Sequence, residues 1–444
     1  MFTFRMTTCI LLVAATACAQ DLVPKAAPGK EPVVLTNAVL HTVSDGIILQ
    51  GTIWFADGVI RGVLPKGYTI DDLPDSPPPR VIDLEGKHVY PGLISAHTTL
   101  GLVEIGMVRQ TVDSDELGEL TPEAIAAVAV NPDTTAIPVA RSNGVLAACV
   151  FPQRGLVPGR ASVIQLDGWT NADLTVRKDA GPVVSWPSMS FGDRPRRRGA
   201  TQRDEADPKQ RAREQRQAIA EAFVQARAWL DAHVADPGIA TDIRHLALVP
   251  ALRGEVPVFV LADDLEQIES AVLWATGAGL HPIIVGGREA EACAPLLRER
   301  HVAVIVDGVH KLPRREDSAY DEAFTLPARL ARQGIEFCIA TGSDFSSDRN
   351  LPYHAATAAA FGLTPQQALA AITLDAARIL GVGDRLGSLT QGKDATLFVT
   401  DGSPLELATR IEMAFIAGRQ VDLRNKQTEL AAKYRERYRQ LRAK

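Results

Sequence analysis

The sequence predicts an α/β fold: a (β/α)8 TIM-like barrel with a small composite β-sandwich domain formed by the N- and C-terminal segments. Three observations lead to this prediction. Apolar strands alternate with amphipathic helices over residues 256–380, a buried strand near residue 93 ends in polar residues, and short alternating strands lie towards both ends. The 444 residues are enough for both parts, because such a barrel takes about 250 residues.

Composition is that of an ordinary globular protein, with 46% hydrophobic and 23% charged residues. The net charge of −6 supplies no overall basic face, so we expect a small-molecule partner and no nucleic acid. Cys149, Cys293 and Cys338 are scattered through apolar segments, which predicts buried thiols rather than a disulfide framework. A homodimer is left open.

The first residues have the order of a secretory signal. Arg5 precedes the apolar run CILLVAATA, and the small residues Ala17 and Ala19 precede the expected cleavage site. We therefore expect a signal peptide at 1–19 and a periplasmic or secreted protein. A weaker alternative is a lipobox ending in Cys18, which would make the protein a membrane-tethered lipoprotein. No other apolar run approaches the ~20 residues that span a bilayer.

Residues 32–90 and 386–423 predict the composite β-sandwich. Asp57-Gly58 stands between two alternating runs and indicates a hairpin. ATLFVTDG at 395–402 and IEMAFIAGRQVDL at 411–423 have the same character, so we expect the two ends of the chain to pair.

Residues 91–385 predict the barrel. The helix after Leu261 is expected to begin at an Asp263 N-cap and to end at Gly277, with Ile268 and Val272 on its apolar face. Eight strands are expected, at 93–97, 145–151, 161–166, 182–186, 256–261, 281–286, 302–308 and 336–342.

Two segments stand apart from this pattern. Residues 187–209 are polar and include Arg196, Arg197 and Arg198, so they predict a long loop that is either a lid over the barrel mouth or a solvated insertion. A helix is expected from about Pro208. The tail at 424–444 predicts a basic amphipathic helix that packs across the protein body, with a stripe made of Leu430, Tyr434, Tyr438 and Leu441.

The most informative stretch is PGLISAHTTLGL at 91–102. Its apolar strand ends in Ser95, His97, Thr98 and Thr99, and polar residues at the carboxyl end of a barrel strand are typical of an active site. The stretch resembles PGLIDxHxH of the amidohydrolase superfamily, which are metal-dependent hydrolases. GSLTQGKDATLFV at 387–399 resembles another segment of the same superfamily, and the chain as a whole resembles its secreted, imidazolonepropionase-related branch.

This resemblance implies a divalent metal ion such as Zn²⁺ held by two histidines after strand one, one histidine each after strands five and six, and an aspartate after strand eight. His97 matches the first histidine, and Thr99 stands in place of the second. Leu261 and Gly286 stand at the strand-five and strand-six positions. Asp344 matches the aspartate, with Asp348 as the alternative, so the metal site is degenerate.

Other residues near the strand ends are candidates to replace the missing ligands. Asp263, Asp264, His310 and His354 all follow predicted strands. Of these we select His310, which gives His97, Asp344 and His310 as candidate metal ligands and His97 and Asp344 as candidate catalytic residues.

The resemblance implies hydrolysis of non-peptide carbon–nitrogen bonds in small amides or cyclic amides, with Asp344 as general base. The alternative is a catalytically degenerate protein that binds a small ligand in the barrel mouth through Thr99, Thr341 and Ser343. A third interpretation is a metal-free enzyme that uses the His97 and Asp344 pair alone.

Overall fold

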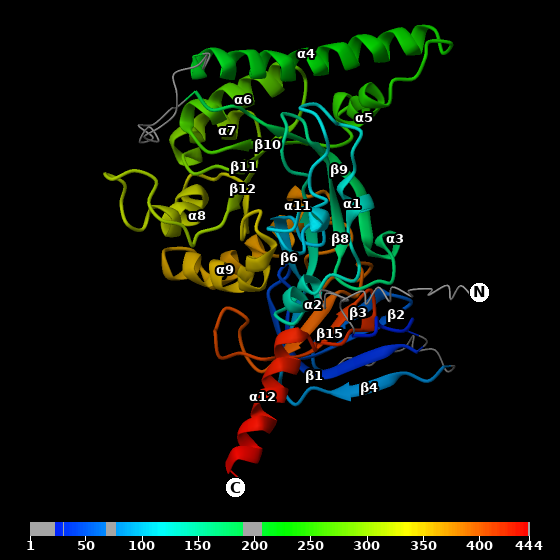
Figure 1. Cartoon of the computed structure of the whole chain (residues 1–444). Helices are drawn as coiled ribbons and strands as arrows, with labels where there is room; N and C mark the ends of the chain where they lie inside the picture. Colours follow the sequence, from blue (N-terminus) through cyan, green and yellow to red (C-terminus); the bar gives the residue numbers. More distant parts are fainter. Residues whose placement is uncertain (1–22, 30, 68–76, 190–206, 443–444) are drawn as a thin grey trace, which may run out of the picture.

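The computed structural model describes residues 23–29, 31–67, 77–189 and 207–442. The expected signal peptide and the arginines at 196–198 lie outside these ranges, as does most of the expected loop at 187–209. Two sheets and their covering helices make up the described chain (Figure 1).

The larger part of the molecule is a nearly closed barrel, as the sequence predicts. Its strands follow the chain in the order β6 to β13 around the sheet. Between the two edges, the Thr99 backbone N–H donates to the Ser343 carbonyl at 3.1 Å. The strands are β6 Leu93–Thr98, β7 Val145–Val150, β8 Gly159–Gln165, β9 Thr175–Ser185, β10 Val258–Ala262, β11 Pro282–Gly286, β12 Val304–Asp307 and β13 Phe337–Ala340.

One strand departs from the expected all-parallel arrangement. β8 runs antiparallel to both β7 and β9, whereas the other neighbouring pairs along the sheet path are parallel. A parallel return needs a crossover of about a dozen residues or more. Only residues 151–158 separate β7 from β8, so the chain turns back as a hairpin.

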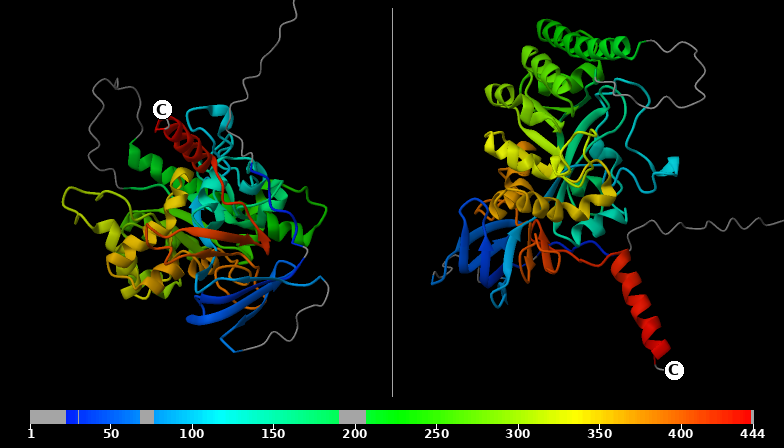
Figure 2. Two further views of the ribbon diagram at one scale, coloured as in Figure 1. Left: turned by 90° about the horizontal axis from the view of Figure 1, so that it is seen from below. Right: turned by 90° about the vertical axis from the view of Figure 1, so that its left-hand side faces the viewer.

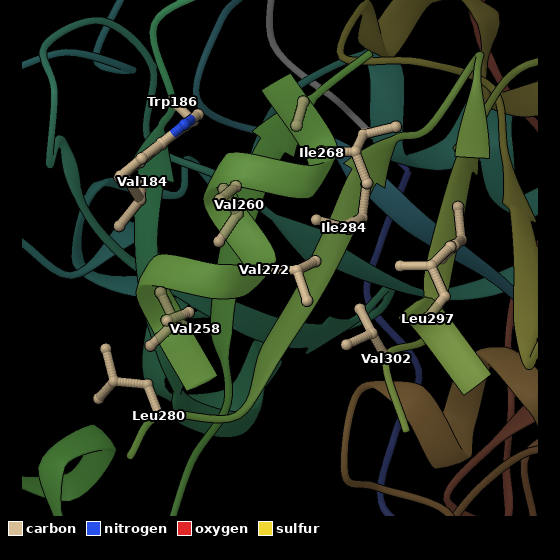
Figure 3. Close-up of a cluster of buried hydrophobic side chains, with 14 of the residues drawn as sticks. Val184, Trp186, Val258, Val260, Ile268, Val272, Leu280, Ile284, Leu297 and Val302 are labelled. Carbon is tan, nitrogen blue, oxygen red and sulfur yellow. The ribbon is translucent and has the colours of Figure 1, made fainter. Parts of the chain in front are cut away.

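Alternate strand residues face the barrel interior and the outer helices. Phe259 on β10 packs inside, whereas Val258 and Val260 point outward to the helix layer. Figure 3 shows this outer layer, in which Ile268 and Val272 of α6 (Leu265–Gly277) lie against the strands. Apolar contact on both faces explains why these strands read as continuous hydrophobic runs.

Helix α6 begins one residue later than expected. Its N-cap is Asp264 rather than Asp263, because Gln267 at the third helical position returns its side-chain oxygen to the Asp264 backbone N–H at 3.3 Å. The predicted apolar face is confirmed, since Ile268, Val272 and Ala275 are buried. The Asp263 carboxylate is thereby left outside the cap, although the Asp263 backbone N–H also donates to the Gln267 side-chain oxygen, at 2.8 Å.

The second sheet joins the two ends of the chain. β5 pairs antiparallel with β14, so residues 88–91 lie beside residues 397–400. Its eight strands form one continuous sheet. They are β1 Val33–His41, β2 Ile47–Ala56, β3 Val59–Leu64, β4 Arg80–Asp83, β5 His88–Pro91, β14 Leu397–Thr400, β15 Ile411–Ile416 and β16 Arg419–Gln420.

Strand β14 of this sheet is buried on both faces. Leu397 and Val399 belong to the core of the sheet itself, whereas Phe398 between them packs towards the barrel. The hairpin between β2 and β3 turns at Asp57 and Gly58, whose φ angles of 53° and 80° suit an Asp-Gly turn.

The remaining helices cover the barrel, except for α12. This last helix projects from the body in Figures 1 and 2 and buries none of its residues, so the expectation that it packs across the protein is wrong. None of the described helices is long and apolar enough to cross a membrane.

The other α-helices are α1 Ala126–Ala129, α2 Ala136–Arg141, α3 Asn171–Leu174, α4 Pro208–Ala235, α5 Ile243–Leu252, α7 Ala294–Glu299, α8 Glu322–Arg332, α9 Leu351–Ala360, α10 Pro365–Ala371 and α11 Leu374–Ile379, and α12 spans Lys426–Arg442. The 3-10 helices are η1 Arg109–Thr111, η2 Ala290–Cys293 and η3 Phe345–Asn350.

Candidate active site

The candidate site lies at the carboxyl ends of the barrel strands, and an irregularity in β6 shapes it. The pairing of β6 with β7 shifts register between Ser95 and Thr98. Strict alternation would send His97 and Ser95 to the same side. Instead, the His97 ring stands edge-on to Phe151 at 4.6 Å between centroids, and Phe151 belongs to the barrel interior.

His97 is held by a carboxylate from β12, which lies two strands from β6 across the closure of the barrel. Its Nδ1 lies 2.7 Å from Oδ1 of Asp307, the last residue of β12. The other oxygen of Asp307 accepts a hydrogen bond from the Lys311 ammonium at 3.3 Å. With an ionised Asp307, Nδ1 of the imidazole acts as the donor.

Asp307 remains ionised in this setting. Burial pushes its pKa upward, but the charges and hydrogen bonds of His97 and Lys311 outweigh that effect and hold the pKa well below its usual range. Asp307 is therefore a fixed negative charge beside the imidazole.

The second nitrogen of the imidazole is left unpartnered. Within the described residues, Nε2 of His97 is buried and makes no hydrogen bond, although the ring is only 3% exposed. The ring lines a cavity of about 170 Å³, together with Asp307 and residues of β10, β11 and the start of α6. A buried ring nitrogen without a partner beside a cavity is suited to accept a proton from a molecule inside it.

A second buried carboxylate lies behind the β6 strand. Asp348 in η3 accepts hydrogen bonds from the hydroxyls of Ser95 at 2.7 Å, Thr98 at 2.6 Å and Thr341 at 2.9 Å. Burial raises the pKa of Asp348 to about 6, although all three hydroxyls favour the charged form. This network ties η3 and the end of β13 to β6.

The structure places the other predicted site residues elsewhere. Asp344 is exposed, and its carboxylate caps η3 by accepting the Ser346 N–H at 3.0 Å. His310 is exposed and shares a hydrogen bond with the Thr357 hydroxyl at 2.8 Å. It stacks on His354, which is buried and accepts the Val309 N–H at 3.1 Å. His97 alone of the predicted catalytic and metal residues lines the cavity.

Two of the three hydroxyls proposed for ligand binding have internal partners, and Ser343 takes part through its backbone carbonyl. Thr99 donates its hydroxyl to the Ser343 carbonyl at 2.8 Å, and Thr341 donates to Asp348. Both side chains therefore stabilise the closure of the barrel between β13 and β6.

The residues present do not fit the metal centre of the superfamily. Leu261 and Gly286 line the cavity at the strand-five and strand-six positions but offer no side-chain ligand. Within the described ranges, no group of three or more His, Cys, Asp or Glu residues is arranged to hold a metal ion. Even an open catalytic zinc site takes about three protein ligands. The unpartnered Nε2 of His97 supplies one.

Asp307 and Lys311 were missed by the sequence analysis. Asp307 ends the predicted strand VAVIVDG, and the rule that selected His97, a polar residue at the carboxyl end of a barrel strand, selects it equally. Lys311 follows four residues later, and its ammonium pairs with the Asp307 carboxylate at 3.3 Å. The sequence thus marked Asp307 as a residue at a strand end, but it did not indicate that Asp307 lies beside His97.

The fold and the position of the cavity define the class of protein. It is a barrel of the kind whose active sites lie at the carboxyl ends of the strands. The chain belongs to the amidohydrolase family, whose family model, described as "Amidohydrolase family", matches residues 204–427, half of the chain. Members of this family are hydrolases that act on carbon–nitrogen bonds and typically use divalent metal ions.

Individual relatives agree with this assignment. The chain is 31% identical to an imidazolonepropionase of Brucella suis over 162 residues, which are 35% of this chain and 38% of that protein. The match thus spans well under half of the curated relative. A solved amidohydrolase from Thermotoga maritima covers 88% of this chain and is itself covered completely, with a TM-score of 0.75 and 22% identity. An adenosine deaminase from Xanthomonas campestris with bound Zn covers 93% of this chain and 99% of its own, with a TM-score of 0.50 and 19% identity. At these identities the two solved structures support the fold alone.

Proposed function

We propose that this protein hydrolyses a carbon–nitrogen bond other than a peptide bond in a small molecule, with His97 as general base. The observation that supports this most strongly is the His97–Asp307 pair, which fixes Nδ1 at 2.7 Å from the carboxylate and leaves Nε2 without a partner in a ring that lines a cavity. Membership of a family of hydrolases that act on C–N bonds supports this reaction class.

The proposed reaction needs only water and the amide. Nε2 of His97 takes a proton from a water molecule, whose oxygen bonds to the carbonyl carbon of the substrate. The C–N bond then breaks, its electron pair stays on nitrogen, and the imidazolium returns the proton to that nitrogen. Asp307 stabilises the imidazolium throughout, and such a base contributes about 10²- to 10⁴-fold in rate.

No step passes through a metal ion in this proposal. The donor set does not fit the family's metal centre, because Leu261 and Gly286 cannot coordinate, and His97 Nε2 alone is too few ligands for a catalytic zinc ion. The zinc expected from the resemblance is therefore not part of the mechanism that we propose.

The test combines metal analysis with assays on a panel of small amides and cyclic amides. We expect hydrolysis that a chelator does not abolish, and a fall of about 10²-fold or more in kcat for His97→Gln. His310→Gln is the control, since His310 lies outside the cavity. A stoichiometric metal ion that is lost together with activity in His97→Gln would overturn the metal-free mechanism.

A second candidate is a non-catalytic protein that binds a small ligand in the same cavity. The observation in its favour is that an apolar residue and a glycine occupy two positions where the family has metal ligands. Ligand binding to the cavity without turnover of any amide in the panel would establish this candidate instead.

A further inference from the structure

The wall of the cavity contains a carboxylate that the proposed mechanism does not use. Asp263 and Asp264 follow β10, and their roles differ. Asp264 caps α6, accepts the Ser188 hydroxyl at 2.6 Å and forms an ion pair with Arg314. Asp263 has none of these contacts and lines the cavity with His97.

The charge of Asp263 is poorly compensated. In the part of the chain that the structure describes, its only side-chain hydrogen bond is a long one from the Arg288 backbone N–H at 3.4 Å, and it joins no ion pair there. The other acidic side chain of the cavity, Asp307, is satisfied by His97 and Lys311. A half-buried carboxylate without a cation offers both of its oxygens to a charged N–H donor of a ligand.

Gly286 leaves room for this carboxylate. It has a φ of +107°, and a Cβ at this position would lie 2.6 Å from Oδ1 of Asp263. The resemblance places a metal-binding histidine at residue 286, so the Asp263 carboxylate occupies the space where that side chain would begin. The glycine at residue 286 therefore both removes a metal ligand of the family and makes room for the Asp263 carboxylate.

We propose that Asp263 binds a cationic group of the substrate, an ammonium, amidinium or guanidinium group, inside this cavity. Two independent features point to a ligand here: the unpaired Asp263 carboxylate and the 3% exposed His97, whose Nε2 lacks a partner. Because both line one cavity of about 170 Å³, a cation on Asp263 brings a neighbouring amide to the imidazole.

The chemistry of the wall defines the class of ligand. A charged N–H donor to a carboxylate forms hydrogen bonds that are shorter and about twice as strong as neutral ones. Leu261 and Val285 on the same wall provide apolar contact for a short carbon chain. The inference rests on the proposed function in one respect, since it states that the substrates of the proposed hydrolase are small amides that carry a positive charge.

The binding test uses guanidinium and urea, which have nearly the same shape and differ in charge. We expect calorimetric titration of the full chain at constant ionic strength to show guanidinium binding at least about tenfold tighter than urea. Asp263→Asn should remove this preference, whereas Asp317→Asn, which alters an exposed carboxylate, should keep it. Equal binding of the two probes, or a preference that survives in Asp263→Asn, would overturn the inference. So would a stoichiometric Zn²⁺ ion that is bound through Asp263 and excludes guanidinium.

Turnover assays separate this inference from the proposed function. Matched cationic and neutral amides should differ in kcat/KM for the wild type and differ little for Asp263→Asn. If guanidinium binds through Asp263 but no amide is hydrolysed, the hydrolase is wrong and the cation site stands. If neutral and cationic amides are hydrolysed equally well, the hydrolase stands and the cation site is wrong.

Discussion

Nδ1 of His97 lies 2.7 Å from Oδ1 of Asp307, although 210 residues separate the two in the chain. The contact joins the first barrel strand to the seventh, and it decides which ring nitrogen is available. With Nδ1 committed to a carboxylate, Nε2 is the ring nitrogen that is left to act as an acceptor. The site is therefore organised around one imidazole, and the residues that the structure describes contain no cluster of metal ligands.

Asp307→Asn should disturb this imidazole without removing its hydrogen-bond partner altogether. The amide lacks the negative charge that favours the Nδ1–H tautomer and stabilises the imidazolium, so we expect a mixture of tautomers and a fall in kcat of about 10²- to 10⁴-fold. Nitrogen-15 spectra of the histidine rings measure the tautomer independently of turnover. His310→Gln is the control, and an unchanged His97 spectrum in Asp307→Asn would contradict the assigned role.

Asp348→Asn should change how stability depends on pH. The pKa of Asp348 is about 6 in the folded protein, compared with about 3.9 for an unfolded chain. A raised pKa means that the folded state holds this proton more tightly, so the stabilisation is complete below about pH 4 and is lost as pH rises through 6. The expected loss is on the order of 3 kcal/mol for wild type, and Asn, which does not titrate, should lack it.

Urea unfolding at pH 4 and pH 7 measures this difference for wild type and Asp348→Asn. Asp344→Asn controls for the general effect of removing one carboxylate. If wild type and Asp348→Asn show the same change between the two pH values, the carboxyl of Asp348 is not held in its neutral form by burial.

The barrel strands were predictable because strands that are buried on both faces consist of continuous runs of apolar residues. The predicted strand at 256–261 overlaps β10, and Asp57-Gly58 marked a hairpin that the structure contains. The direction of β8 was not predictable from its apolar residues, because parallel and antiparallel strands can contain the same apolar run. The short connection at 151–158 contained the information, as it leaves no room for a crossover helix.

A site residue was predictable only where its own type and its position at a strand end were enough to identify it. His97 stood out as a polar residue at a strand end, but its partnership with Asp307 depends on the barrel bringing β6 near β12. The choice between Asp344 and Asp348 depended on η3, which leaves the first exposed as its cap and buries the second. The N-cap assignment was displaced by one residue, and that displacement leaves Asp263 available for the cavity.

Removal of residues 426–444 should leave the stability of the protein unchanged to within about 0.5 kcal/mol, because α12 buries none of its residues. The apolar stripe in this basic segment predicted an amphipathic helix, but an amphipathic pattern does not say what covers the apolar face. Ile268→Ala in α6 is the positive control, with an expected cost of about 2–5 kcal/mol for a fully buried side chain. Urea unfolding curves measure both, and a clear loss of stability on truncation would show that α12 packs against the protein in solution.

Gly286→His should fail to restore the family's metal ligand and should destabilise the fold. The backbone at 286 has a φ of +107°, where an L-residue is strained by about 1–3 kcal/mol, and its Cβ would collide with the Asp263 carboxylate. We expect a lower free energy of unfolding and no gain in zinc affinity, measured by urea denaturation and calorimetry. Gly277→Ala in α6, where a Cβ meets nothing within 4 Å, is the matched control and should stabilise by about 0.5–1 kcal/mol. A stable Gly286→His protein that binds zinc tightly would show that the strand-six position has kept its original geometry and that Asp263 yields to a side chain there.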